Sequence, residues 1–181
     1  FVVIYRDERR SATVYHQRGV VIMARNRSLA DLNNKIIKRS AILETTIAEL
    51  AETKQDMNVL EIGFGEGRVL LTLAWMFRNQ IRFFGVDKKQ VPPTEKREDL
   101  WRVAETYDVF PTGSDVTLPE IFFYDATNLH FSDEQLDFVY SAVVIRFVPD
   151  KARLLEEVSR VLRPGGVAIL QIGESKWDYP Y

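Results

Sequence analysis

Several residue types that commonly build active or structural sites are absent or scarce in this chain of 181 residues. It has no cysteine, which excludes disulfides, zinc–thiolate sites and cysteine nucleophiles. Its two histidines, His16 and His130, are too few for a multi-histidine metal site. No uninterrupted apolar run approaches the roughly 18 residues of a membrane-spanning helix, and the first residues lack a signal-peptide layout. We therefore expect no metal, no membrane span and a cytoplasmic location.

Apolar residues are abundant, but charge is unevenly distributed. The chain is 46% hydrophobic and 12% aromatic, which is enough for a single domain with one core. Residues 1–40 hold nine Lys or Arg and three acidic residues, so they carry +6, and the other 141 residues carry −8 because the whole chain carries −2. We interpret residues 1–40 as a basic helical lead-in or lid and residues 41–181 as the core. A solvated helix surface is favoured over nucleic-acid binding, because no aromatic or glycine pattern accompanies the charges.

Short apolar runs alternate with amphipathic stretches from residue 58 onward. We predict strands over residues 58–63, 81–87, 120–126, 136–142 and 167–173. We predict helices over residues 27–53, 67–78, 94–107 and 150–162, with Ser28, Thr94 and Asp150 as N-caps and Pro164-Gly165-Gly166 ending the last helix. This alternation predicts an α/β fold with a doubly wound, mostly parallel sheet and helices on both faces. Residues 108–119 are rich in turn formers and are expected to be an exposed loop.

The strongest local signal is EIGFGEG, residues 61–67, which leaves a predicted strand and enters a predicted helix. Three glycines allow the backbone to approach a ligand closely, and the helix N-terminus offers free N–H groups. A dinucleotide fingerprint would need a third glycine where this chain has Arg68. Asp87 ends the next strand, where a carboxylate can accept hydrogen bonds from both ribose hydroxyls. The two features together predict a nucleoside-containing ligand.

In these motifs the chain resembles the class I S-adenosylmethionine-dependent methyltransferases, especially their small-molecule branch. The resemblance covers about residues 40–173 and is carried by VLEIGFGEG (59–67), FFGVD (83–87), YDATNLHFSDEQLDFVYS (124–141) and RVLRPGGVAIL (160–170). It implies a Rossmann-like fold and transfer of a methyl group from S-adenosyl-L-methionine to a small-molecule acceptor, with nucleic acid as a less favoured acceptor. Neither the acceptor nor the oligomeric state can be inferred from the sequence.

The resemblance also implies roles for the glycine loop. Gly63, Gly65 and Gly67 would line the methionine moiety and the ribose, together with Phe64 in the same loop. Glu61 would order this loop or reach the cofactor's amino group through water.

The ends of the later strands would complete the cofactor site by the same resemblance. Asp87 would hold the ribose hydroxyls, and Lys88 would pack beside the adenine. Asp125 would accept a hydrogen bond from the adenine amino group, while the backbone N–H of Ala126 would face a ring nitrogen. The methionine part and the transferable methyl would be bordered by Ser141, Ala142 and Val143.

Two features depart from the family pattern. Many small-molecule members have a histidine after the fourth strand, where this chain has Arg146, so no catalytic residue is assigned. The family's sheet usually ends in a C-terminal antiparallel strand pair, and only ESKWDYPY follows the fifth strand. We therefore expect either a sheet without that pair or a chain that is a fragment.

Two other functions stay open from the sequence. A catalytically weak or inactive cofactor-binding or interaction domain would keep the same fold and pocket. A nicotinamide-dependent oxidoreductase is less favoured because of Arg68. We also expect the lead-in to fold over the pocket and to supply part of the acceptor site, the alternative being a helix packed on the sheet edge. Its candidate residues are Tyr5, Tyr15, His16, Arg18 and Met23.

Overall fold

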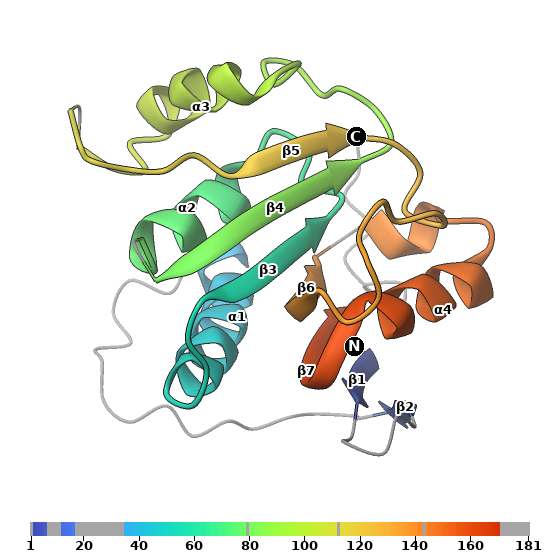
Figure 1. Cartoon of the computed structure of the whole chain (residues 1–181). Helices are drawn as coiled ribbons and strands as arrows, with labels where there is room; N and C mark the ends of the chain where they lie inside the picture. Colours follow the sequence, from blue (N-terminus) through green and yellow to red (C-terminus); the bar gives the residue numbers. More distant parts are fainter. Residues whose placement is uncertain are drawn as a thin grey trace.

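The computed structural model describes residues 2–6, 12–16, 35–78, 80–111, 113–142 and 144–170. One seven-stranded sheet has the order β2-β1-β7-β6-β3-β4-β5 (Figure 1). Its strands are β1 (Val2–Arg6), β2 (Ala12–His16), β3 (Met57–Ile62), β4 (Ile81–Asp87), β5 (Glu120–Phe123), β6 (Leu136–Ser141) and β7 (Leu162–Leu170). The helices are α1 (Lys35–Ala51), α2 (Arg68–Met76), α3 (Leu100–Thr106) and α4 (Lys151–Val161), with short 3₁₀ helices η2 (Arg97–Asp99) and η3 (Val144–Phe147).

Five neighbouring strands, β5-β4-β3-β6-β7, run parallel. The chain passes from β3 outward to β4 and β5, and then returns to the other side of β3 to form β6 and β7. The strand order therefore reverses between β3 and β6, which is the switch point where sheets of this type bind ligands. The predicted doubly wound α/β fold is confirmed.

An antiparallel strand pair closes the β7 side of the sheet, and it comes from the N-terminal part of the chain. β1 pairs antiparallel with β7 from Val2–Leu170 to Tyr5–Val167, and β2 pairs antiparallel with β1. Residues 2–6 and 12–16 are therefore strands, not the helical lead-in that the charge pattern suggested. Both segments are rich in β-branched and aromatic residues, which favour strands, and the free edge of β7 offers unpaired backbone groups.

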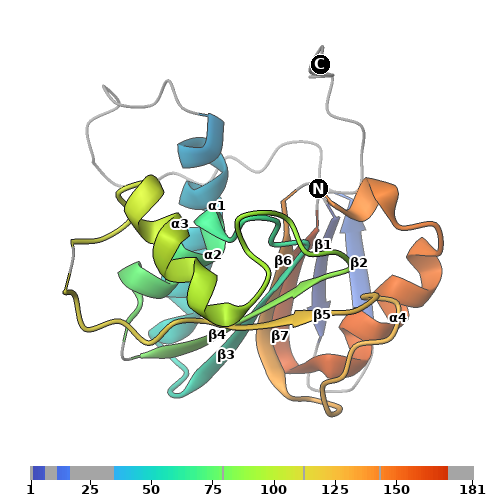
Figure 2. The same cartoon turned by 90° about the horizontal axis from the view of Figure 1, so that it is seen from above.

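The helices cover both faces of the sheet. Figure 2 shows α1, α2 and α3 on one face and α4 on the other. Successive residues of a strand point to opposite faces, and the two hydrophobic clusters follow this rule. Val59 packs in the cluster that contains Ile47 of α1 and Leu70 of α2, whereas its neighbour Leu60 packs in the cluster that contains Val158 of α4. No helix of the described residues has both the length and the apolarity that crossing a bilayer requires.

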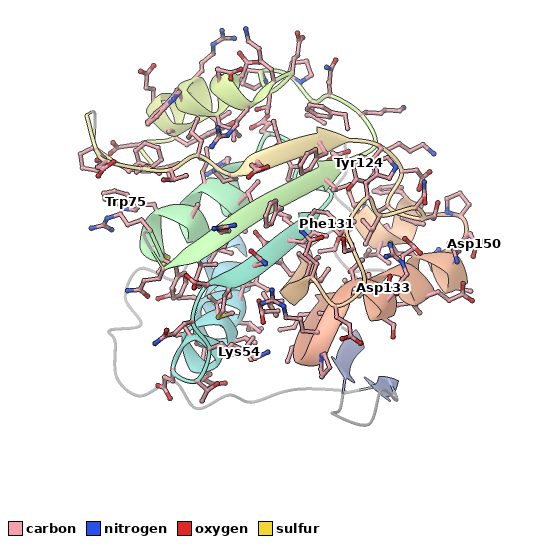
Figure 3. All side chains as sticks on the ribbon, viewed as in Figure 1. Lys54, Trp75, Tyr124, Phe131, Asp133 and Asp150 are labelled. Atoms are coloured by element: carbon pink, nitrogen blue, oxygen red, sulfur yellow. The ribbon has the colours of Figure 1, made fainter. Side chains whose placement is uncertain are left out.

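The predicted N-cap is right at Asp150 and wrong at Thr94, and α4 ends at Val161, one residue before the predicted end. Asp150 begins α4, and its side chain accepts a hydrogen bond of 2.9 Å from the Arg153 backbone N–H (Figure 3). Thr94 does not cap a helix: it is fully buried, and its hydroxyl donates to the Glu66 carbonyl at 2.8 Å, so η2 and α3 begin later. The Pro164-Gly165-Gly166 segment lies inside β7, where an irregularity in the pairing with β6 accommodates it.

Two other expectations concern segments before and between these elements. Ser28, Arg18 and Met23 lie outside the described residues, so the cap of the first helix and that part of the lid remain predictions. The other residues proposed for the lid, Tyr5, Tyr15 and His16, belong to β1 and β2 at the edge of the sheet. The segment 108–119 is a loop, as predicted, but it is only partly exposed. Phe110, Val116 and Leu118 are buried in a third hydrophobic cluster with α3, because their apolar side chains outweigh the surrounding turn formers.

Candidate functional site

A cavity of about 590 Å³ lies at the carboxyl ends of the central parallel strands. Six of the residues predicted to bind cofactor line it: Gly63, Gly65, Asp87, Lys88, Asp125 and Ala126. The remaining lining residues are Ile62, Val86, Lys89, Val91, Tyr124, Val144, Phe147, Val148 and Pro149. The fold therefore brings the ends of β3, β4 and β5 together around one space, as the strand order predicts.

The glycine loop between β3 and α2 is positioned by backbone hydrogen bonds. The Gly63 N–H donates to the Val86 carbonyl at 2.7 Å. Gly63 has a φ of +78°, and a Cβ there would lie 2.3 Å from Cβ of Val144, so a side chain does not fit. Gly65 also has a positive φ, +56°, but a Cβ there would meet no protein atom within 4 Å. Gly65 thus borders open space at the cavity.

The segment after β4 holds the loop from its other side. The buried Thr94 hydroxyl donates to the Glu66 carbonyl, and the Tyr107 hydroxyl donates to Glu66 Oε2 at 2.6 Å. Leu100 packs so closely on Gly67 that a Cβ at Gly67 would lie 2.7 Å from its side chain. Sequence reasoning missed these supports because they are contacts between residues distant in the chain.

Asp87 joins the end of β4 to the glycine loop. Its Oδ2 accepts a hydrogen bond of 2.9 Å from the Gly65 N–H, and its Oδ1 accepts one of 3.3 Å from the Lys89 N–H. An ionised carboxylate has about four lone-pair sites. Asp87 can therefore accept further hydrogen bonds from hydroxyl groups in the cavity.

Asp125, just beyond β5, carries three hydrogen bonds. Its Oδ2 accepts from Lys88 Nζ at 2.7 Å, and its Oδ1 accepts from the Thr127 N–H at 3.0 Å and the Thr127 hydroxyl at 2.9 Å. The Lys88 ammonium, followed by the Thr127 donors, lowers the pKa of Asp125 to about 2. Asp125 is therefore ionised at neutral pH. Its neighbour Tyr124 directly follows β5 (Figure 3). The Tyr124 ring stacks on the ring of His130 with the two centroids 4.0 Å apart.

Five predicted site residues lie outside the cavity lining. Glu61, only 2% exposed, is buried behind the loop. Phe64 is buried too and packs on Phe123 with ring centroids 5.7 Å apart, so it supports the loop from within the core. Gly67 is the N-cap of α2, and the hydroxyl of the buried Ser141 has no hydrogen-bond partner among the described residues. Ala142 is half-buried next to it. Val143 lies outside the described residues.

An apolar wall of the cavity was not predicted. Val144, Phe147, Val148 and Pro149 follow β6, and Phe147 is 64% exposed. Residues three apart share one side of a 3₁₀ helix, so Val144 and Phe147 of η3 both reach the cavity. Only the i, i+3 spacing in VIRFVPD signals this wall in the sequence.

Arg146 lies in the same helix and does not line the cavity. Its guanidinium lies 4.6 Å from the centroid of the Phe147 ring, and its Nε is buried without a hydrogen-bond partner. Within the part of the chain that the structure describes, Arg146 forms no ion pair with a carboxylate. Among the described residues it is therefore not the surface ion-pair partner that a lone arginine most often is.

Comparisons with curated proteins find methyltransferases. The chain is 33% identical over 110 residues to human arsenite methyltransferase. The matched residues make up 60% of this chain and 28% of that protein. It is 25% identical over 128 residues to the sterol 4-C-methyltransferase strm-1 of Caenorhabditis elegans, covering 71% of this chain and 34% of the relative. The chain thus spans about a third or less of the length of these relatives.

Solved structures show the same fold. The YcgJ protein of Bacillus subtilis matches 78% of this chain and 53% of its own, with a TM-score of 0.57 and 22% identity. A SAM-dependent methyltransferase from Aquifex aeolicus matches 81% of this chain and 76% of its own, with a TM-score of 0.54 and 20% identity. A family model for the methyltransferase domain matches residues 60–170, which is more than half of the chain. The chain therefore belongs to the class I methyltransferase family, whose cofactor is S-adenosylmethionine.

Proposed function

We propose that the protein transfers the methyl group of S-adenosylmethionine to a small-molecule acceptor, and that the cavity beside the glycine loop holds the cofactor. The observation that carries this proposal is the meeting of Gly65, Asp87 and Asp125 around one cavity of about 590 Å³. An adenosine needs hydrogen-bond acceptors for its ribose hydroxyls and its amino group, and it needs apolar walls for its ring. The lining offers all of these.

The carboxylates and the glycines suit the separate parts of the cofactor. Asp87 would accept from the ribose hydroxyls with the lone pairs that its two backbone donors leave free. Asp125 would accept from the adenine amino group, and Lys88 and the Ala126 N–H would border the adenine. For that contact Asp125 must share or give up its hydrogen bond with Lys88. The open space at Gly65 fits a ligand lying directly on the loop backbone.

The methionine part would lie toward the end of β6. Gly63, Gly65 and Gly67 would border it from the glycine loop, with Phe64 beneath them. Glu61 would act from behind the same loop. On the side opposite the glycine loop, the methionine part would be bordered by Ser141, Ala142 and Val143. When bound, S-adenosylmethionine supplies an electrophilic methyl group on its sulfonium sulfur, and the protein's part is to align an acceptor with that methyl and to exclude water.

The apolar wall supports an acceptor with an apolar surface. Phe147, 64% exposed, stands on this wall with Val144, Val148 and Pro149. The relatives are named for sterol, arsenite and demethylmenaquinone methylation, which are all small acceptors. Among the described residues that line the cavity no histidine is present. The proposed reaction can draw much of its catalysis from positioning the nucleophile and the methyl, and it needs a base only when the acceptor must lose a proton.

Calorimetry with S-adenosylhomocysteine tests the cofactor assignment. We expect micromolar affinity and no binding of NAD, which a nicotinamide-dependent oxidoreductase would bind instead. Turnover is then measured with S-adenosylmethionine labelled in its methyl group and a panel of a sterol, a demethylated naphthoquinol and arsenite. Phe147→Ala should lower turnover of an apolar acceptor at least tenfold while cofactor affinity changes less than about threefold. Binding without turnover of any small acceptor would favour the inactive cofactor-binding domain.

A further inference from the structure

A carboxyl group without a basic partner lies inside the sheet behind the glycine loop. Glu61 of β3 is 2% exposed and comes two residues before Gly63. Directly opposite on β6 stands Tyr140, which is fully buried. The Tyr140 hydroxyl donates to Glu61 Oε2 at 3.0 Å. The pair therefore bridges the two strands whose carboxyl ends flank the switch point.

The groups around Glu61 offer hydrogen bonds but no positive charge. β6 contributes the Tyr140 hydroxyl, α2 contributes the backbone N–H of Leu70, and β4 contributes a second carboxylate, Asp87. Leu43 and Ile47 of α1, which share a hydrophobic cluster with Tyr140, are apolar. Across the described part of the chain, no Lys, Arg or His forms an ion pair with Glu61.

A buried carboxyl group without a nearby positive charge keeps its proton, and it ionises more readily when a positive charge binds close to it. Burial raises the pKa of Glu61 to about 8, and Asp87 adds to this, while the Tyr140 and Leu70 donors oppose it. Burial also raises the pKa of Tyr140 well above its usual value, so its hydroxyl stays a donor. Asp87, which lines the cavity, is among the groups that raise the pKa of Glu61, so a charge at the cavity wall is expected to act on Glu61.

Bound in the proposed site, the cofactor would bring positive charge toward Glu61. S-adenosylmethionine carries an ammonium and a sulfonium but only one carboxylate, whereas S-adenosylhomocysteine lacks the sulfonium. A nearby positive charge favours the ionised form of a carboxyl group. Binding of the methylated cofactor should therefore ionise Glu61, and binding of the demethylated product should do so less.

Building on the proposed function, we propose that Glu61 and Tyr140 form a proton-linked positioning pair: Glu61 keeps its proton in the cofactor-free protein and releases it when S-adenosylmethionine binds. The O–H bond of the Glu61 carboxyl breaks, the electron pair stays on the carboxylate, and the proton passes to the solvent buffer. The Tyr140 hydroxyl then holds the carboxylate in place behind the loop. The pair thereby lets the site distinguish the charged cofactor from its neutral product.

Calorimetry in two buffers measures the proton directly. S-adenosylmethionine is titrated at about pH 7 in phosphate and in Tris, whose ionisation enthalpies differ strongly. We expect the wild-type protein to release between half and one proton with S-adenosylmethionine, and less with S-adenosylhomocysteine. In Glu61→Gln the release should vanish, and affinity for S-adenosylmethionine should fall about tenfold relative to the product.

The variant Tyr140→Phe tests whether Tyr140 positions the Glu61 carboxylate or only contributes to folding. Loss of the donor should move the pH dependence of S-adenosylmethionine affinity upward by roughly one pH unit, because the hydroxyl favours the ionised carboxylate. Glu105→Gln, at an exposed position of α3 away from the cavity lining, is the control. Its pH profile should be that of the wild type.

The outcomes separate this inference from the proposed function. If both cofactor forms bind and the binding enthalpies corrected for the buffers show no proton release, the inference is wrong and the proposed function stands. If neither cofactor form binds, the proposed function is wrong, and the inference that rests on it is wrong with it. Should either variant fail to fold, as judged by circular dichroism, the wild-type comparison of the two cofactor forms alone decides.

Discussion

The Gly65 N–H donates a hydrogen bond of 2.9 Å to Asp87 Oδ2, which ties the loop after β3 to the end of β4. This bond fixes the orientation of a carboxylate that faces the cavity and leaves part of its accepting capacity free. One side chain thus both shapes the glycine loop and is offered to a ligand.

Asp87→Ala should weaken S-adenosylhomocysteine binding by about 2–3 kcal/mol, or some 30- to 150-fold, because a pair of charge-assisted hydrogen bonds is lost. Calorimetry measures the dissociation constant. Glu105→Ala, an exposed change on α3 away from the cavity lining, is the control and should leave it unchanged. An unaltered constant in Asp87→Ala would show that this carboxylate does not hold the ribose.

Gly65→Val should abolish cofactor binding while the protein still folds. A Cβ at this position meets no protein atom within 4 Å, so the valine side chain would enter the space proposed for the ligand, and the positive φ costs about 1–3 kcal/mol of stability. Gly113→Val is a matched control, since Gly113 also has a positive φ, +81°, and open surroundings but lies away from the cavity. Both variants should lose similar unfolding free energy in urea. Equal affinity in the two variants would mean that the loop does not touch cofactor.

Glu61→Gln should flatten the pH dependence of stability. The folded-state pKa of Glu61, about 8, lies above its ordinary value of 4.5, so the folded protein holds an extra proton and loses stability as pH rises from about 4.5 to about 8. Glutamine cannot titrate and still accepts from Tyr140. Between pH 5 and 8 the wild type should therefore lose on the order of 2–4 kcal/mol more unfolding free energy than the variant. Parallel urea curves at the two pH values would contradict this prediction.

Ile4→Pro should destabilise the protein more than Val14→Pro. Ile4 of β1 pairs with Val14 on one side and Ala168 of β7 on the other, whereas β2 stands at the edge of the sheet. Proline removes a ladder donor and is tolerated mainly on edge strands, so the inner position should cost about 1–3 kcal/mol more. Exposure of the β7 edge should also cause self-association in sedimentation experiments. Equal unfolding free energies would show that β1 contributes little to the sheet.

The sequence by itself determined the parallel core and part of the cavity lining. The strands that became β3, β4 and β6 were predicted to within one residue at each end, because apolar runs between glycines and prolines are local signals. Six of the predicted binding residues line the cavity, because parallel strands bring their carboxyl ends to one edge. Residues at these ends can therefore be assigned without knowing their contacts.

Tertiary structure alone decided which distant groups meet. Thr94 looked like a helix cap, yet it is buried against Glu66, and Glu61 gained a partner 79 residues away in Tyr140. β1 pairs with the edge of β7, and no pattern within residues 1–16 indicates this partner. These outcomes depend on strand order and register, which arise from the packing of the whole sheet, whereas periodicity and turn chemistry report only on neighbours along the chain.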